Sequence, residues 1–269
     1  MVYFPHCKIN LGLHVVAKRD DGYHNIETCF YPVPRTDILE VIKANTFAFS
    51  TSGLPVAGLP EQNLCVKAYH LLANDFRLGS VKIHLHKILP MGAGVGGGSA
   101  DAAFMLRALT SLFQLKLSHD QLKSYAVELG SDCAFFLQDQ PMLADGRGEV
   151  LSTTPVSLKG KYLVLVKPDV HVATADAYAG VVPAKPVNNL QDVLQLPIAS
   201  WREQLVNDFE TSVFKKFPVI AELKKQLYDN GALYASMSGS GASVFGIFDA
   251  PVNLQSKFSD VDYWAGTLA

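Results

Sequence analysis

Apolar and polar residues alternate at residues 8–16 and 81–89, and residues 37–43 form a third strand candidate. A period of two places successive side chains on opposite faces of a strand, so the pattern predicts half-buried β-strands. Asp20-Asp21-Gly22 follows the first strand and combines residue types that favour tight turns. We therefore expect a turn at residues 20–22.

Apolar residues recur at helical spacing in residues 64–73 and 100–113. Ser118 and Gln121 form a capping-box pattern, and Gly130 supplies a stop signal, which together predict a further helix. Beyond residue 150 the pattern predicts strands at residues 161–166, 234–238 and 243–248 and helices at residues 201–207 and 218–230. The chain is therefore expected to have an α+β fold.

The length of 269 residues is the size at which one hydrophobic core usually divides into two. We place the domain boundary in the polar, proline-containing residues 152–160, which gives domains at residues 1–152 and 153–269. Residues 181–197 are rich in Pro and Asn and are expected to form a surface excursion with little regular structure.

Composition narrows the class of protein. With 49% apolar and 10% aromatic residues, the chain is neither disordered nor fibrous. A formal net charge of -2 provides no global positive field for nucleic acid or an anionic membrane. The four cysteines have neither disulfide-motif nor zinc-site spacing, and no signal-peptide-like or membrane-spanning run is present. We expect a cytoplasmic enzyme or binding protein, and the sequence gives no indication of its oligomeric state.

A glycine-rich segment at residues 90–103, P-M-G-A-G-V-G-G-G-S-A-D-A-A, connects a predicted strand to a predicted helix. Its five glycines lack side chains that would keep the main chain away from an anion, and they permit convergent N–H groups. The following helix start adds unpaired N–H groups and a positive dipole end. This order of parts predicts a polyphosphate site; the alternative is a flexible connector, which would cost conformational entropy without a ligand.

Two other glycine motifs have to be considered. Gly92, Gly94 and Gly97 satisfy G-x-G-x-x-G, but the loop lies about ninety residues into the chain, and no second strand ending in an acid follows its helix. A Walker A loop would need Gly-Lys-Ser/Thr, which is absent.

The glycine loop resembles the ATP loop of the kinases that phosphorylate galactose, homoserine, mevalonate and phosphomevalonate, the GHMP kinase superfamily. That superfamily has three motifs, and the chain has all three in order: residues 8–11 (K-I-N-L), the glycine loop, and residues 238–242 (S-G-S-G-A). Residues 21–24 (D-G-Y-H), 27–30 (E-T-C-F) and 130–132 (G-S-D) are most similar to the branch that phosphorylates 4-diphosphocytidyl-2-C-methyl-D-erythritol. The resemblance covers nearly the whole chain except residues 181–197.

The resemblance implies a two-domain GHMP kinase fold, with an N-terminal domain like domain 2 of ribosomal protein S5 and a ferredoxin-like C-terminal domain. ATP and the acceptor would bind in the cleft between the domains. The reaction would be phosphorylation of the 2-hydroxyl of the diphosphocytidyl substrate in the non-mevalonate route to isoprenoids.

By the same resemblance, Asp132 is the base beside the acceptor hydroxyl, and Lys8 bridges it and the transferring phosphate. Such a lysine would keep the carboxylate ionised and stabilise the emerging alkoxide. Without the family, Asp132 would be a helix N-cap and Lys8 a solvated strand residue. The residues expected to bind ATP are Pro90, Met91, Gly92, Ala93, Gly94, Val95, Gly96, Gly97, Gly98, Ser99, Ala100 and Asn63.

The cytidine end of the substrate needs stacking and hydrogen bonding. Tyr23 and Phe30 are the expected stacking surfaces, and His24 is expected to read the polar edge of cytosine. Without the family, Tyr23 and Phe30 would be core residues and His24 a turn residue. Further substrate contacts implied by the resemblance are Asn10, Thr174 and Tyr178, although the family more often has phenylalanine at the last position.

Mg²⁺ is expected to arrive with ATP and to be held by phosphates and water, with help from Ser99. His84 and His86 share a strand face, but no third ligand accompanies them, so a solvated face is the better interpretation. Asp101 is a weaker candidate for a charged metal ligand because the family often has asparagine there.

Two other functions remain open. A sibling kinase could act on mevalonate or homoserine, but those acceptors offer no base for Tyr23 and Phe30 to stack on. A catalytically silent nucleotide-binding regulator could share the fold, but it would have no need of Lys8 and Asp132. Residues 238–242 could be a simple hairpin, although the other two motifs favour a turn that closes on the glycine loop.

Overall fold

A computed structural model describes residues 1–269, and its internal contacts divide the chain into two compact units. The first unit comprises residues 1–7, 35–91 and 96–139, and the second comprises residues 8–34, 92–95 and 140–269. The two units interleave along the sequence, so they do not coincide with the segments 1–152 and 153–269. The domain boundary at residue 152 therefore stays a prediction.

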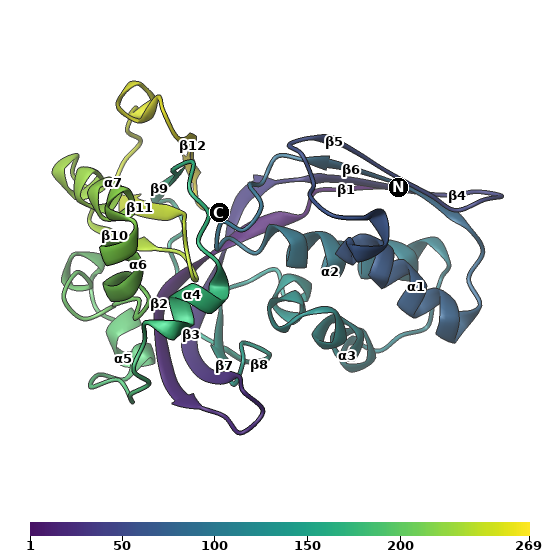
Figure 1. Cartoon of the computed structure of the whole chain (residues 1–269), viewed down its shortest axis with the longest axis horizontal. Coiled ribbons are helices and arrows are strands. Elements are labelled where there is room, and N and C mark those ends of the chain that lie inside the picture. The colour runs from purple at the N-terminus through teal and green to yellow at the C-terminus, as the bar shows by residue number, and fades with distance from the viewer. The chain divides into compact units, whose positions relative to one another are not determined.

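The first unit contains a four-stranded sheet with α-helices packed against it (Figure 1). In spatial order its strands are β1 (Val2–Tyr3), β4 (Ile38–Lys43), β6 (Val81–Lys87) and β5 (Ala48–Gly53). Strand β4 is antiparallel to both neighbours, whereas β5 runs parallel to β6. The helical segments are η1 (Pro60–Gln62), α1 (Leu64–Phe76), α2 (Gly97–Leu112), α3 (His119–Leu129) and η2 (Ser131–Leu137). Helix α2 packs against β4 and lies beside α1.

The second unit contains two four-stranded sheets. The first has the order β2 (His6–Lys18), β3 (His24–Thr36), β7 (Met142–Asp145) and β8 (Val150–Thr153). The second sheet is entirely antiparallel, in the order β10 (Tyr234–Met237), β11 (Val244–Phe248), β9 (Tyr162–Lys167) and β12 (Asp262–Thr267). The helical segments are α4 (Thr174–Ala179), α5 (Leu190–Leu194), η3 (Ile198–Ser200), α6 (Glu210–Lys216), α7 (Pro218–Asp229) and η4 (Gln255–Phe258).

One hydrophobic core joins the two sheets of the second unit. Leu13 and Val15 of β2 pack in the same cluster as Val164 and Val244 of the antiparallel sheet, with Phe209 from the segment before α6. Helix α7 covers β10 and β11. Because β2 is fixed in this core, its other side chains are held at defined positions.

Several predicted elements are confirmed. The strand expected at residues 8–16 is the longer β2, and β6 alternates buried and more exposed side chains from Val81 to Lys87. Ser118 caps α3 through the Gln121 N–H at 3.2 Å, while the Gln121 side chain accepts from the Ser118 N–H at 2.9 Å. Gly130 ends that helix.

The helix expected at residues 201–207 is wrong. Trp201 and Leu205 are both buried at helical spacing, but a single turn joins them, in which the Leu205 N–H donates to the Trp201 carbonyl at 2.8 Å. The chain then extends so that the Val206 carbonyl accepts from the Leu13 N–H at 2.9 Å. A helix could not make this bond to the edge of β2, so tertiary pairing overrides the local pattern.

Residues 181–197 contain more structure than expected, since α5 lies inside them. The Asn189 side chain caps this helix by accepting from the Gln191 and Asp192 N–H groups. Strand β3 was not predicted at all, because Pro32 and Pro34 interrupt it and proline disfavours strand interiors. This strand carries His24 and Phe30.

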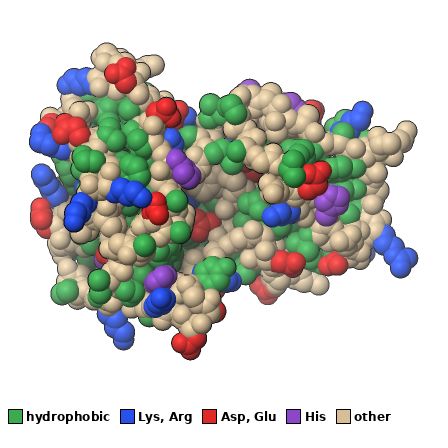
Figure 2. Space-filling view, in the orientation of Figure 1, with side chains coloured by type: hydrophobic (Ala, Val, Ile, Leu, Met, Phe, Trp, Pro, Cys, Tyr) green, Lys and Arg blue, Asp and Glu red, His purple; other side chains and the backbone are tan.

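Charged side chains of both signs are interspersed on the face drawn in Figure 2, as the net charge of -2 suggests. Every helix lacks the length or the apolar character that crossing a membrane requires.

Three charged side chains are buried together in the first unit. The ammonium group of Lys87 on β6 donates to Asp37 and, at 2.8 Å, to Asp101 on α2, and none of the three residues is more than 3% exposed. Asp37 also accepts from the N–H groups of Ile88 and Leu89. Burial raises the pKa of Asp101 to about 7, although the Lys87 ammonium acts in the opposite direction.

This raised pKa predicts how stability responds to pH. Between about pH 4 and pH 7 the folded protein retains a proton on Asp101 that the unfolded chain releases, so the free energy of unfolding falls as pH rises. The Asp101→Asn variant has no titrating carboxyl group at this residue, so it lacks this contribution to the pH dependence. We expect the Tm of Asp101→Asn minus that of wild type to increase from pH 5 to pH 7 and then to level off, as measured by thermal unfolding.

Asp249→Asn is the matched control. A hydrogen bond from Lys161 lowers the pKa of the exposed Asp249 carboxyl, so its titration is complete below this range and its Tm offset should be constant. A constant offset for Asp101→Asn as well would contradict the assigned cause.

Candidate functional site

Lys8 is a buried lysine on β2. It is 3% exposed, and its ammonium group donates to the Asn10 side-chain oxygen at 2.6 Å and to the Gly94 carbonyl at 3.0 Å. The same ammonium lies 5.0 Å from the centre of the Phe30 ring. A solvated strand lysine is therefore excluded, and the structure instead holds this cation at a defined position.

Asn10 continues the network along β2. Its amide nitrogen donates to the Thr28 hydroxyl at 2.9 Å, and that hydroxyl donates to the Gly12 carbonyl at 2.5 Å. Asn10 and Thr28 are both buried, so these bonds are protected from water. The amide orientation is thereby fixed, with its oxygen toward Lys8 and one N–H toward β3.

Residues 238–242 meet the glycine loop, as their resemblance to the third motif implied. The Ser238 hydroxyl donates to the Gly94 carbonyl at 3.0 Å, and the Ser243 N–H donates to the Ala93 carbonyl at 3.1 Å. The Gly94 carbonyl thus accepts from both Lys8 and Ser238. Strand, loop and turn are joined at one oxygen atom.

The close approach requires glycine at residue 94. Gly94 has φ +75°, and a Cβ atom there would lie 2.0 Å from the Ser238 carbonyl oxygen. On the opposite side, a Cβ atom on Gly239 would lie 2.9 Å from the Gly94 carbonyl oxygen. Both contacts are with backbone, which cannot move aside as a flexible side chain could.

Along the chain, the glycine loop is followed by α2, which belongs to the first unit. Gly96 has φ +73° and caps the helix, which begins at Gly97, three residues earlier than predicted, because glycine is a poor helix former and masks the start. The first N–H seen to make a helical bond is that of Ala100, to the Gly96 carbonyl at 2.8 Å. The amides of Gly97, Gly98 and Ser99 precede it in the first turn, which is a favourable place for an anion.

Pro90 and Met91 precede this turn in the first unit, and Asn63 belongs to the same unit. The Asn63 side chain caps α1 by accepting from the Cys65 N–H at 2.9 Å. Its structural role is therefore clear, and its proximity to adenine stays a prediction.

Asp132 lies in the first turn of η2, one residue after Ser131. Gly130, not Asp132, is the N-cap of this segment, so the capping alternative is wrong. Asp132 is partly exposed, whereas burial raises the pKa of the neighbouring Cys133 thiol to about 12. The Cys133 thiol therefore stays protonated near neutral pH.

Aromatic rings gather beside β3 in the second unit. The His24 ring stacks on Tyr178 of α4, with centroids 4.8 Å apart and planes at 22°, and Phe209 meets Tyr178 edge-on at 4.7 Å. Tyr23 is 57% exposed and has the Arg147 guanidinium 5.2 Å above its ring. Three of the predicted substrate residues, Tyr23, His24 and Tyr178, are thus neither simple core residues nor scattered.

Phe30 differs from the prediction. It is 1% exposed and lies beneath the Lys8 ammonium, so its ring offers a base no open face. Thr174 begins α4, and its hydroxyl lies 3.3 Å from that of Ser240 in the third motif.

The sequence interpretation missed residues 207–210. Asn207 donates to the Met237 and Gly239 carbonyls, and Asp208 accepts from the Val15 N–H at 2.8 Å. Phe209 supports Tyr178, and Glu210 accepts from the Met237 N–H at 2.8 Å. The only sequence signal was an Asn-Asp pair before a short helix, which reads equally well as an ordinary cap.

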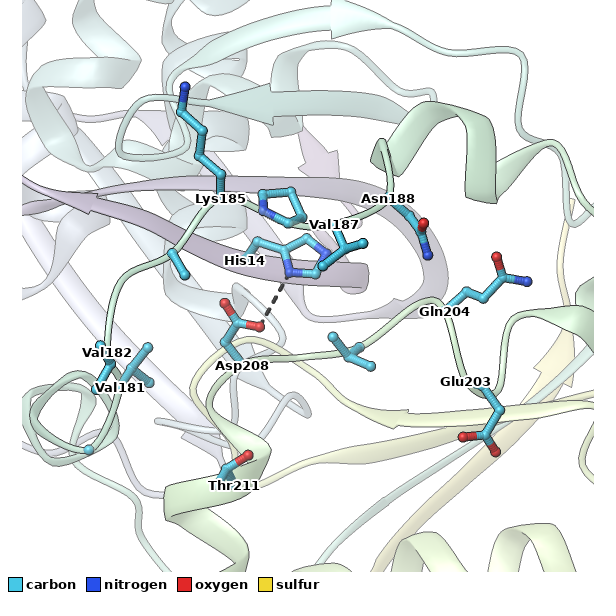
Figure 3. Close-up of a pocket in the computed structure, with 14 residues that line it drawn as sticks. His14, Val181, Val182, Lys185, Val187, Asn188, Glu203, Gln204, Asp208 and Thr211 are labelled. Carbon is cyan, nitrogen blue, oxygen red and sulfur yellow. Dashed lines mark hydrogen bonds and ion pairs between the residues drawn. The ribbon is translucent and has the colours of Figure 1, made fainter.

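A cavity of about 550 Å³ opens beside this segment (Figure 3). Its close-up shows the His14 imidazole facing the Asp208 carboxylate, with Nδ1 and Oδ1 3.3 Å apart, while Lys185 and Glu203 point away from His14. None of the predicted site residues lines this cavity.

The candidate metal positions have other partners. His84 and His86 on β6 face Ser50 and Ser52 of β5 at 2.9 Å, and Asp101 is bound by Lys87. No group of three or more His, Cys, Asp and Glu residues comes together as a possible metal site.

Comparison with known proteins decides the family. Residues 63–142 match the GHMP kinases N terminal domain, and residues 192–262 match the GHMP kinases C terminal domain. A curated relative from Parabacteroides distasonis, 4-diphosphocytidyl-2-C-methyl-D-erythritol kinase, is 49% identical over 271 residues, covering 100% of both chains. The chain belongs to this family of GHMP kinases. The predicted ATP-dependent small-molecule kinase is therefore confirmed.

Solved structures agree with this assignment. A crystal structure of 4-(cytidine 5'-diphospho)-2C-methyl-D-erythritol kinase matches this GHMP kinase with a TM-score of 0.84 and 30% identity, covering 99% of this chain and 98% of that chain. A mevalonate kinase structure matches with a TM-score of 0.71 but 12% identity, covering 98% of each chain, and so shows the fold alone. The predicted α+β fold with two GHMP kinase domains is confirmed.

Proposed function

We propose that this kinase transfers the terminal phosphate of ATP to the 2-hydroxyl of 4-diphosphocytidyl-2-C-methyl-D-erythritol. The observation that carries the proposal is the full-length identity of 49% to a relative with that name. It favours this acceptor over mevalonate or homoserine. The reaction belongs to the non-mevalonate route to isoprenoids, and we propose a cytoplasmic location for it.

Asp132 is the proposed base that takes the proton of the acceptor hydroxyl, and Lys8 is the proposed cation beside the transferring phosphate. Lys8 suits this role because Asn10 and Gly94 hold its ammonium group at a defined position, so little reorganisation is needed. Phosphoryl transfer depends mainly on such positioning and on charge stabilisation.

The proposed phosphate site is the main chain from Pro90 to Ala100, with Asn63 beside adenine. Positive φ angles at Gly92, Gly94 and Gly96, together with the first turn of α2, fit a cradle built from backbone N–H groups. Mg²⁺ would enter with ATP, neutralise phosphate charge, and be held by phosphate and water oxygens with help from Ser99.

The proposed cytidine contacts are Tyr23, His24 and Tyr178, with Asn10 and Thr174 toward the rest of the substrate. Phe30 is better assigned to the floor under Lys8 than to stacking, because it is buried. The tyrosine at residue 178 retains an aromatic face where the family more often has phenylalanine.

We expect Lys8→Ala and Asp132→Asn each to reduce turnover by roughly 100-fold or more, because each removes a group needed in the transition state. Both proteins should remain folded by circular dichroism. Lys159→Ala, which removes an exposed lysine, is the control and should have wild-type turnover. Near-normal turnover of a purified Lys8→Ala or Asp132→Asn protein would refute that residue's role.

Acceptor choice is tested by measuring ADP release with ATP and Mg²⁺ in the presence of the cytidyl substrate, mevalonate or homoserine. We expect release only with the cytidyl substrate, since only it offers a base to the aromatic group around His24. Phosphorylation of mevalonate in place of the cytidyl compound would overturn the proposed acceptor, and ATP binding without transfer to any acceptor would favour a silent regulator.

A further inference from the structure

Asn207 is a buried residue whose side-chain N–H groups donate to the backbone around Ser238. It is 3% exposed, and its nitrogen donates to the Met237 carbonyl at 2.8 Å and to the Gly239 carbonyl at 2.9 Å. Its oxygen accepts from the Phe209 N–H at 3.0 Å. Both N–H donors of the amide are thus used on the two residues that flank Ser238.

Ser238 in turn shares both of its acceptors with Lys8. Its hydroxyl donates to the Gly94 carbonyl at 3.0 Å and lies 3.5 Å from the Asn10 side-chain oxygen. The Lys8 ammonium donates to the same two oxygen atoms. A displacement of Ser238 would therefore alter the two acceptors that orient the ammonium.

Asn207 is also anchored to the strand that carries Lys8. Its neighbours Val206 and Asp208 form backbone hydrogen bonds with Leu13 on either side, which pairs this short segment with the edge of β2. Asp208 adds a side-chain bond to the Val15 N–H. The amide consequently connects β2 to the Ser238 turn at a fixed separation.

We propose that Asn207 is a positioning residue for phosphoryl transfer, which sets the Ser238 turn and, through Gly94 and Asn10, the Lys8 ammonium. The proposal rests on the function proposed for Lys8. Asn207 is not the only residue that holds the turn in the folded protein. The Glu210 carboxylate also accepts from the Met237 N–H, and the Ser243 N–H donates to the Ala93 carbonyl. Without the amide donors the turn should therefore still form, but its position should change.

Asn207→Asp tests the proposal. The substitution retains the size of the side chain and the oxygen that accepts from the Phe209 N–H. It replaces the N–H donors with a carboxylate oxygen that faces the Met237 and Gly239 carbonyls. With the concentrations of ATP and cytidyl substrate each varied at pH 8, we expect kcat to fall roughly 10-fold to 100-fold while both KM values change by less than about 3-fold, since a transition-state contact is affected. In the Ser238→Ala background the same change should lower kcat by less than about 3-fold, because the connection is already broken.

Tyr234→Phe is the matched control. It removes a buried hydrogen bond to the Leu205 carbonyl in the same unit, so it should lower Tm while leaving kcat within about 2-fold of wild type. If Asn207→Asp does not fold, Asn207→Ala removes the donors without adding repulsion and carries the same comparison.

The proposal is overturned if the Asn207 variant lowers Tm like the control but retains kcat. It is also overturned if the effects of the Asn207 and Ser238 changes multiply in full, because they would then act independently. Lys8→Ala separates the two levels of inference: normal turnover would reject the function proposed for Lys8, whereas an inactive Lys8→Ala beside a fully active Asn207→Asp would reject positioning alone.

Discussion

The close approach of two backbone segments at Gly94 is the constraint on which the site in the second unit depends. Its carbonyl accepts from Lys8 and Ser238, so one oxygen atom joins β2, the glycine loop and the turn after β10. A Cβ atom on Gly94 would lie 2.0 Å from the Ser238 carbonyl oxygen, which leaves room only for glycine. Gly94 thus allows contact within the protein, a task separate from the phosphate contacts that we propose for the other glycines of the loop.

Burial protects the hydrogen bonds of this junction from water. Lys8, Asn10 and Ser238 are each no more than 3% exposed, so their hydrogen bonds are made where water competes least. A lysine in such surroundings cannot adopt the many conformations of a surface lysine, and the entropy of ordering it is lost during folding and not during catalysis. The first unit contains a different buried cluster, in which Lys87 connects β6 to α2 through Asp101. There Lys87 is held between the carboxyl groups of Asp37 and Asp101, which suits a structural role.

The sequence predicted the parts of the site that repeat a local pattern. Alternation located β2 and β6, and the run of glycines located the loop, because strand period and side-chain size are properties of neighbouring residues. The roles proposed for Lys8 and Asp132 came from the family resemblance alone. Phe30 could not be predicted to lie beneath Lys8, since its burial depends on β3. That strand was not predicted, because its prolines disfavour a strand interior. Residues 207–210 were missed because each side chain acts on a partner distant in sequence, such as Gly239, and no local pattern records that distance.

The most direct test of the Gly94 junction compares Gly94→Ala with Gly160→Ala. Both glycines have φ between +75° and +79°, but Gly160 has no atoms close to the position of an added Cβ. Gly160→Ala should therefore lose only about 1 kcal/mol of stability from backbone strain and keep full turnover. Gly94→Ala should lose more stability, measured by denaturant unfolding, together with most of its turnover, because the loop and turn must separate. Equal stability losses and full turnover in both variants would contradict the account.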